Sequence, residues 1–190
     1  KEEKSREQIF ADVVNRRNFF YYLLRIESND ERFFKEAKLV GIDLSGTRFM
    51  TAIMRIDTKK PLDQEIVFDI YQLCIASVNR INSFFKVNGI LLENDDIVFL
   101  TTNDGKNGET LFSQTNRFLN QIILDIQKRT GISCIASFGS CYKSIQEVQI
   151  SFDEAKNVFE NIDKDVFELP RQIDKEKNVF IDQETEDTLI

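Results

Sequence analysis

Histidine and tryptophan are absent from this 190-residue sequence, and proline occurs only twice. Without an imidazole, the chain lacks the general base of Ser-His-Asp and Cys-His catalysis and any histidine ligand for a metal. The scarcity of proline, with 17 phenylalanines supplying most of the aromatic content, favours long helices and continuous strands over a loop-rich scaffold. These absences exclude many enzyme classes and predict regular secondary structure.

Long hydrophobic runs are also missing. No apolar stretch approaches the roughly 20 residues of a membrane span, and no secretory signal peptide opens the sequence. The three cysteines, Cys74, Cys134 and Cys141, are an odd number without CxxC spacing, and each lies in an apolar stretch. This pattern favours reduced thiols over a disulfide or a zinc site. We therefore expect a cytoplasmic protein that does not contact a membrane.

Acidic residues outnumber basic ones, 32 to 25, which gives a formal net charge of −7. A surface of this sign repels polyanions, whereas nucleic-acid binding needs a clustered basic patch. With 42% hydrophobic residues, the chain can bury one substantial core. Because it begins at Lys1 without an initiator methionine, we expect a piece of a longer protein, in which this part does not bind DNA directly.

The first segment, about residues 2–26, is predicted to be helical because apolar residues recur at alternating steps of three and four. The recurring residues around Arg17 are Phe10, Val13, Phe20 and Leu24. Such a stripe is a short a/d seam of the kind that joins two helices in a dimer. It fits packing against the chain's own domain equally well, so both interpretations stay open.

Helical and strand patterns alternate along the rest of the chain. Helices are predicted near 29–41, over 64–86 with a stop at Asn88-Gly89, over about 111–131, and from a capping box at Ser144 to Ile162. Strands are predicted over 48–57, 90–92, 96–100, 132–138 and 166–169, with 90–100 forming a hairpin. Because only the hairpin joins its strands by a short turn, we expect an α/β (α+β) fold with a mixed sheet and helices on its faces, the layout of a ferredoxin-like palm.

One stretch near the end of this pattern carries a more specific signal. Gly139-Ser-Cys-Tyr142 is followed by Ser151-Phe-Asp-Glu154-Ala155. This resembles the Gly-x-x-Tyr and Ser-Tyr-x-Glu-Ala signature of GGDEF-like domains, a nucleotide-cyclase palm class, in the degenerate version found within AraC-type bacterial response regulators and sensors. The resemblance implies three parts: an N-terminal linker or dimerisation helix (1–28), a GGDEF-like domain (29–170) and an acidic tether (171–190).

The resemblance also indicates what this chain has lost. Active members place Gly-Gly-Asp/Glu-Glu-Phe on the central hairpin turn, where the glycines admit the nucleotide and the acids serve a metal. The corresponding residues here are Glu93, Asn94, Asp95, Asp96 and Ile97. Arg55 stands where the first strand would supply a metal-binding acid, although Asp57 remains. A cation at that place opposes metal binding, so the resemblance implies no cyclase activity, no metal and no cofactor.

Two functions are compatible with these residues. The resemblance implies a noncatalytic signalling domain, expected as a homodimer, between a receiver or membrane sensor domain and a helix-turn-helix DNA reader. The alternative is a receptor that binds a nucleotide or another small molecule without turnover, with Asp57, Asp95 and Asp96 holding a cation; a solvated acidic turn explains these acids more simply. Ser140, Cys141 and Tyr142 form a nucleophile cluster, but no base lies near them in sequence, and we assign them no catalysis.

Overall fold

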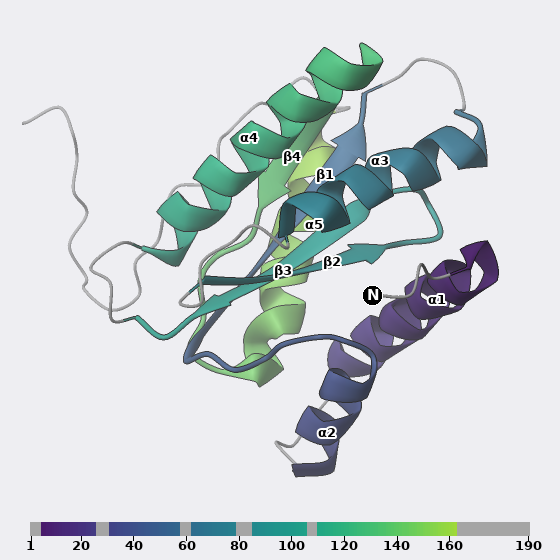
Figure 1. The fold of residues 1–190 in the computed structure, drawn as a ribbon. Coiled ribbons are helices and arrows are strands. Elements are labelled where there is room, and N and C mark those ends of the chain that lie inside the picture. Colours follow the sequence, from purple (N-terminus) through teal and green to yellow (C-terminus); the bar gives the residue numbers. More distant parts are fainter. Residues whose placement is uncertain (1–4, 26–30, 58–61, 79–84, 106–109, 163–190) are drawn as a thin grey trace, which may run out of the picture.

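The structure, a computed structural model, describes residues 5–25, 31–57, 62–78, 85–105 and 110–162. In chain order its elements are α1 (Arg6–Leu23), α2 (Glu31–Leu39), β1 (Arg48–Ile56), α3 (Gln64–Val78), β2 (Phe85–Leu91), β3 (Ile97–Asn103), α4 (Leu111–Thr130), β4 (Cys134–Phe138) and α5 (Val148–Ile162). A turn of 3-10 helix, Ile145–Glu147, leads into α5. Figure 1 shows the strands forming one sheet with the helices arranged around it.

The strands of the sheet lie in the order β2-β3-β1-β4, and every neighbouring pair is antiparallel. The α+β character expected from the sequence is confirmed, but the mixed sheet is wrong for the described strands. Helix α3 connects β1 to β2, and α4 connects β3 to β4. Each crossover thus joins two strands of like direction that have an antiparallel strand between them, a β-α-β-β-α-β connectivity.

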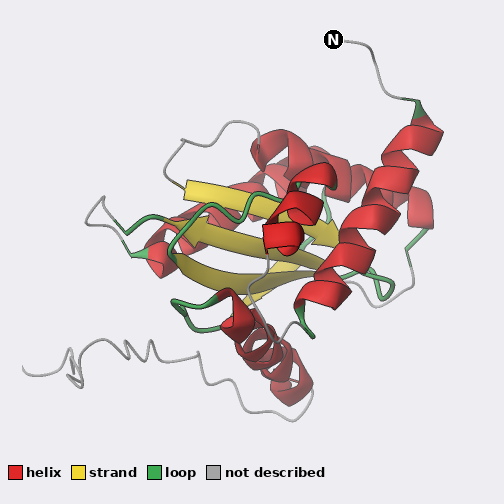
Figure 2. Ribbon diagram, turned by 90° about the horizontal axis from the view of Figure 1, so that it is seen from below, coloured by secondary structure: helices red, strands yellow, loops and turns green. Residues whose placement is uncertain are grey.

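Each face of the sheet carries its own hydrophobic core. Helices α3 and α4 cover one face, where Ile70 and Leu119 are buried. Helices α2 and α5 pack on the other, where Phe33 and Ala155 are buried together with Ile53 of β1. Figure 2 shows helices on both sides of the strands. Burial of one large apolar side chain contributes about 1.5–3 kcal/mol, so these two layers supply most of the favourable folding free energy.

Helix α1 lies along β2, at the edge of the sheet (Figure 1). It begins with a capping box, in which Ser5 Oγ accepts a hydrogen bond from Gln8 N–H and the Gln8 side chain accepts one from Ser5 N–H. Val13 belongs to the core under α3 and α4, and Phe20 to the core on the opposite face. The helix therefore covers an edge strand that would otherwise present unpaired backbone groups.

The boundary between α3 and β2 differs from the expectation. The helix ends at Val78 rather than near residue 86, and Phe85, expected on the helix, is the first residue of β2. Asn88 and Gly89, expected to stop the helix, lie inside the strand. Tertiary contacts outweigh their low strand propensity, because the buried Asn88 amide bonds the Asp43 and Leu100 backbones.

The expected hairpin is present, with both strands longer than their apolar cores. β2 begins five residues before Ile90, and β3 continues from Ile97 to Asn103 through three polar residues that are buried. The strand predicted at 166–169 and the tether at 171–190 lie outside the described residues.

Candidate functional site

The β2–β3 turn carries four of the residues singled out by the sequence, Glu93, Asn94, Asp95 and Asp96. Leu92 N–H donates to the Asp96 carbonyl oxygen at 2.9 Å and closes the turn. Asp95 has a φ of 65°, in the left-handed region that aspartate tolerates better than most residues. Glu93, Asn94 and Asp95 are exposed at the tip, whereas Asp96 is buried. The turn thus holds one carboxylate inside the protein and leaves the others in solvent.

Asp96 is paired with Arg55 at the end of β1. The register that sets Met54 opposite Ile97 brings the two side chains together across the sheet. Arg55 Nε donates to Asp96 Oδ1 and Arg55 Nη2 to Asp96 Oδ2, each at 2.8 Å, and Asn94 Nδ2 adds a bond to Oδ2 at 2.7 Å. A bidentate guanidinium–carboxylate pair of this kind is both strong and fixed in geometry.

The flat face of the same guanidinium lies against α5. Arg55 Cζ is 4.3 Å from the centroid of the Phe159 ring, within the range of a cation–π contact. Phe159 is buried, and it is a residue that the sequence pattern placed only on the apolar face of its helix. Its spacing on α5 matches that of core phenylalanines, so nothing in the sequence separates it from them.

This arrangement leaves Asp96 poorly suited to a cation. Its two oxygens already accept three hydrogen bonds, two of them from a positively charged group. Asp57 is exposed beyond the end of β1, where its N–H bonds the Ser133 carbonyl. Among the described residues, no three His, Cys, Asp or Glu side chains converge as metal ligands. The structure therefore does not bring Asp57, Asp95 and Asp96 into a cation site.

The junction between β4 and α5 accounts for the second sequence signal. A Cβ on Gly139 would lie 1.8 Å from the Ser151 carbonyl oxygen, so the strand can approach the helix this closely only with glycine. Ser151 Oγ donates to the Ser140 carbonyl at 2.8 Å and accepts from Thr51 N–H at 2.9 Å. One buried hydroxyl thus joins α5 to β1 and to the residue that follows Gly139.

Glu154 completes this junction from the next turn of α5. Its carboxylate accepts the Ser140 N–H and the Tyr142 O–H, each at 2.7 Å. Burial raises the pKa of Tyr142 well above its usual range, and the bond to Glu154 raises it further. A phenol held in its protonated form is a poor nucleophile, and it here donates a structural hydrogen bond. Tyr142, Ser151 and Glu154 therefore each have a role in holding the strand–helix corner.

The proposed seam on α1 is divided between the protein interior and its surface. Val13 and Phe20 are buried in the chain's own cores, and Leu24 packs against one of them. Phe10 is 62% exposed. Arg17 Nε lies 3.9 Å from Glu93 Oε1 of the β2–β3 turn. Packing on the chain's own domain therefore occupies most of the stripe.

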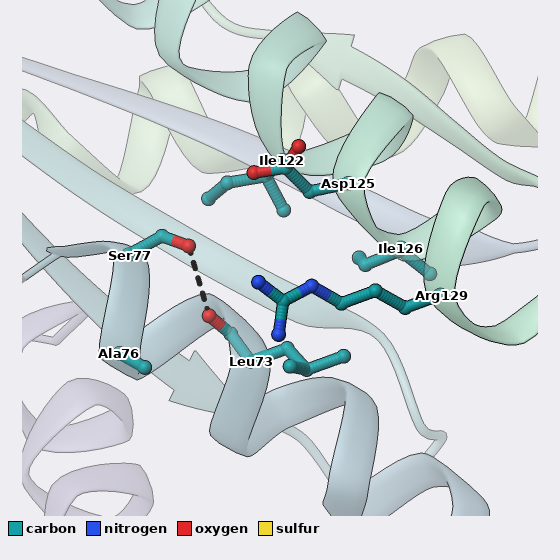
Figure 3. A pocket seen from close by; sticks show the side chains of 7 residues that line it. All are labelled: Leu73, Ala76, Ser77, Ile122, Asp125, Ile126 and Arg129. Atoms are coloured by element: carbon teal, nitrogen blue, oxygen red, sulfur yellow. Dashed lines mark hydrogen bonds between the residues drawn. The ribbon is translucent and has the colours of Figure 1, made fainter.

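A small cavity between α3 and α4 lies apart from these residues (Figure 3). It is lined by Leu73, Ala76, Ser77, Ile122, Asp125, Ile126 and Arg129. Its volume of about 30 Å³ has room for no more than one or two water molecules. Ser77 Oγ, at its wall, already donates to the Leu73 carbonyl at 3.0 Å. The cavity is too small for a nucleotide.

Neither a protein-family model nor a curated protein matches this sequence. Among solved structures, a C-terminal segment of the alpha subunit of aIF2 from Pyrococcus abyssi is similar at a TM-score of 0.35 and 15% identity, covering 68% of this chain and 72% of that one. A likeness this distant carries no functional argument.

No described helix has both the length and the apolar character needed to cross a lipid bilayer.

Proposed function

We propose that this chain is a degenerate GGDEF-like domain with a ferredoxin-like palm, which performs no catalysis and couples an input domain to a DNA reader in an AraC-type bacterial transcription regulator. The observation that carries the proposal is the Arg55–Asp96 ion pair. In the resembled family these two places supply acids to a metal. Here a guanidinium occupies the position of one acid and binds the other through two hydrogen bonds.

The hairpin turn supports the same conclusion. Glu93 and Asn94 stand where glycines would admit a nucleotide, and both carry side chains at the exposed tip. The Asn94 amide is directed to Asp96, so it strengthens the internal ion pair. Glu93 would add a negative charge beside a triphosphate. The turn is therefore organised around Arg55 rather than around a ligand.

The β4–α5 junction supports the family assignment independently. Gly139, Tyr142, Ser151 and Glu154 are the residues on which the sequence resemblance rests, and all four meet at one corner. Such contacts restrain the shape of the domain without needing any substrate. This is the property expected of a part that has kept its fold and lost its reaction.

The coupling role is supported by how α1 is held. Because α1 contributes to both cores, a displacement of this helix changes packing on both faces of the sheet. We propose a receiver or membrane sensor domain on its N-terminal side, a helix-turn-helix domain beyond the acidic tether, a cytoplasmic location and a homodimer. Reading the gene on both sides of residues 1–190 tests the partners, since a neighbouring sequence without a helix-turn-helix segment would remove this role.

Incubation with GTP and Mg²⁺ tests the absence of catalysis. We expect no cyclic dinucleotide, and no change in the thermal unfolding midpoint with saturating GTP, cyclic di-GMP or Mg²⁺. Product formation would overturn the proposal. A raised midpoint without product would favour the receptor function, which no contact among the described residues supports.

Light scattering of the intact chain tests the homodimer, and a monomeric mass at high concentration would exclude it.

A further inference from the structure

The first and last helices of the described chain are connected at two places. Phe20 of α1 packs edge-to-face on Phe152 of α5, with ring centroids 5.4 Å apart. Phe159, two helical turns further along α5, lies against the guanidinium of Arg55. Helix α5 is therefore fixed by α1 directly near its start and by Arg55 near its end.

The second connection also leads back to α1. Arg17 lies about one helical turn before Phe20, and its Nε is 3.9 Å from Glu93 Oε1 on the β2–β3 turn. The Leu92 N–H to Asp96 carbonyl bond closes that turn, so Glu93 and Asp96 move as parts of one short unit. Asp96 in turn holds Arg55 through two hydrogen bonds.

We propose that these contacts form a relay through which α1 sets the position of the second half of α5. The Phe20–Phe152 contact holds the start of α5 in place while the relay acts on its second half. The members of the relay are Arg17, Glu93, Asn94, Asp96, Arg55 and Phe159. The relay rests on the proposed function and deepens it, because it names the route by which an input at the N-terminal helix reaches the last described one.

The links of the relay differ in strength. The Arg55–Asp96 bonds are bidentate and the Asp96 side chain is only 6% exposed. A displacement of Asp96 therefore moves Arg55 with it. The Arg17–Glu93 contact is longer, and the Glu93 side chain is 72% exposed. The Arg17 side chain is only 20% exposed, but a pair with one partner in solvent is weak, because solvent screens it and because ordering two long side chains costs entropy. A small displacement of α1 therefore acts first at Arg17 and Glu93.

Hydrogen exchange of the 190-residue chain tests the relay. Glu93→Gln and Arg17→Gln each remove the charge attraction between residues 17 and 93. We expect either change to raise amide exchange in α5 residues 156–161 about two-fold relative to α4, and the double variant to do no more, because both act on one link. Arg6→Gln is the matched control, since Arg6 lies on the same helix and forms an exposed ion pair with Glu65 of α3.

Combining Glu93→Gln with a substitution of Arg55 distinguishes a relay from a general loss of stability in the domain. Arg55→Lys keeps a cation beside Asp96 but loses the planar, bidentate contact. In this background Glu93→Gln is expected to leave α5 exchange unchanged. Unaltered α5 exchange in Glu93→Gln itself, an equal effect of Arg6→Gln, or an effect of Glu93→Gln that persists in the Arg55→Lys background would overturn the relay. None of those results contradicts the proposed coupling function, because α1 and α5 remain in contact through Phe20 and Phe152. Detection of cyclic dinucleotide would contradict that function, but it would not change the interpretation of the exchange results.

Discussion

Arg55 is the residue whose surroundings the sequence described least well. The family resemblance implied that this cation stands where a metal-binding acid would lie, and therefore that it opposes metal binding. The structure adds that the edge of the guanidinium is bonded to Asp96 and that its face lies on Phe159. Both partners are distant in sequence, and both are buried. Arg55 therefore compensates a buried charge and also packs an aromatic ring of the core.

Replacing this cation should destabilise the protein. In Arg55→Ala, the buried Asp96 carboxylate loses its compensating charge and Phe159 loses a packing partner. We expect a loss of about 2 kcal/mol in the free energy of unfolding, below the value for a fully buried pair because the Arg55 side chain is 40% exposed. Urea-induced unfolding measures this loss. Arg6→Ala, which breaks an exposed pair, should leave the free energy of unfolding nearly unchanged, and equal effects of the two substitutions would contradict this account.

Tyr142 should make the fold sensitive to alkaline pH. Burial and the bond to Glu154 raise its pKa in the folded state, while the unfolded chain has the ordinary value of about 10. Its contribution to stability is thus fully present below about pH 10 and is lost as pH rises toward the folded-state pKa. Urea midpoints at pH 8 and pH 11 should therefore differ more for the wild type than for Tyr142→Phe. The same difference in both proteins would show that Tyr142 is not responsible.

Among the elements, the β4–α5 corner depends on a close approach of backbones. In Gly139→Ala the new Cβ meets the Ser151 carbonyl, and the strand and helix must separate. We expect a destabilisation of about 3 kcal/mol, measured by urea unfolding. Gly131→Ala is a suitable control, because that position has a φ of 73° but no atom within 4 Å of the added carbon. Its backbone strain should cost about 1 kcal/mol, so a larger loss for Gly131 would refute the packing explanation.

Helix α1 carries two phenylalanines of the predicted seam, and we expect their replacement to affect stability to very different extents. Phe20 has no exposed surface and contacts Phe152, whereas Phe10 is 62% exposed. Phe20→Ala should lower the free energy of unfolding by about 3–5 kcal/mol, and Phe10→Ala by less than about 0.5 kcal/mol. Thermal or urea unfolding of a dilute solution measures both. A comparable loss from Phe10→Ala that grows with protein concentration would instead indicate that this end of the stripe joins two copies.

At the scale of the whole molecule, α1 is part of the domain rather than a detachable linker. Deleting residues 1–26 removes Val13 from one core and Phe20 from the other, and uncovers the outer edge of β2. We expect the shortened chain to lose its cooperative urea transition. A shortened chain that unfolds as sharply as the intact one would show that α1 is dispensable. For this reason single substitutions, and not truncation, are the better probe of a dimer.

The extent of agreement between sequence and structure depends on the range of the interactions. Periodic apolar residues located the helices and the hairpin, because which face of a helix or strand is buried follows from local spacing. They misplaced the end of α3, since the helical spacing continues into Phe85, where the chain already pairs with β3. The antiparallel sheet was also missed, because strand order is decided by which strands meet in space.

The candidate site divides in the same way. The sequence by itself determined the absence of histidine, the presence of Glu93 and Asn94 rather than glycines at the turn and the presence of a cation at residue 55, because these are matters of residue identity. Only the tertiary structure decided that Asp96 is buried and bound to Arg55, that Phe159 supports this pair, and that Glu154 closes the corner at Tyr142. Such partners lie 12 to 104 positions apart, and folding is what brings them within bonding distance.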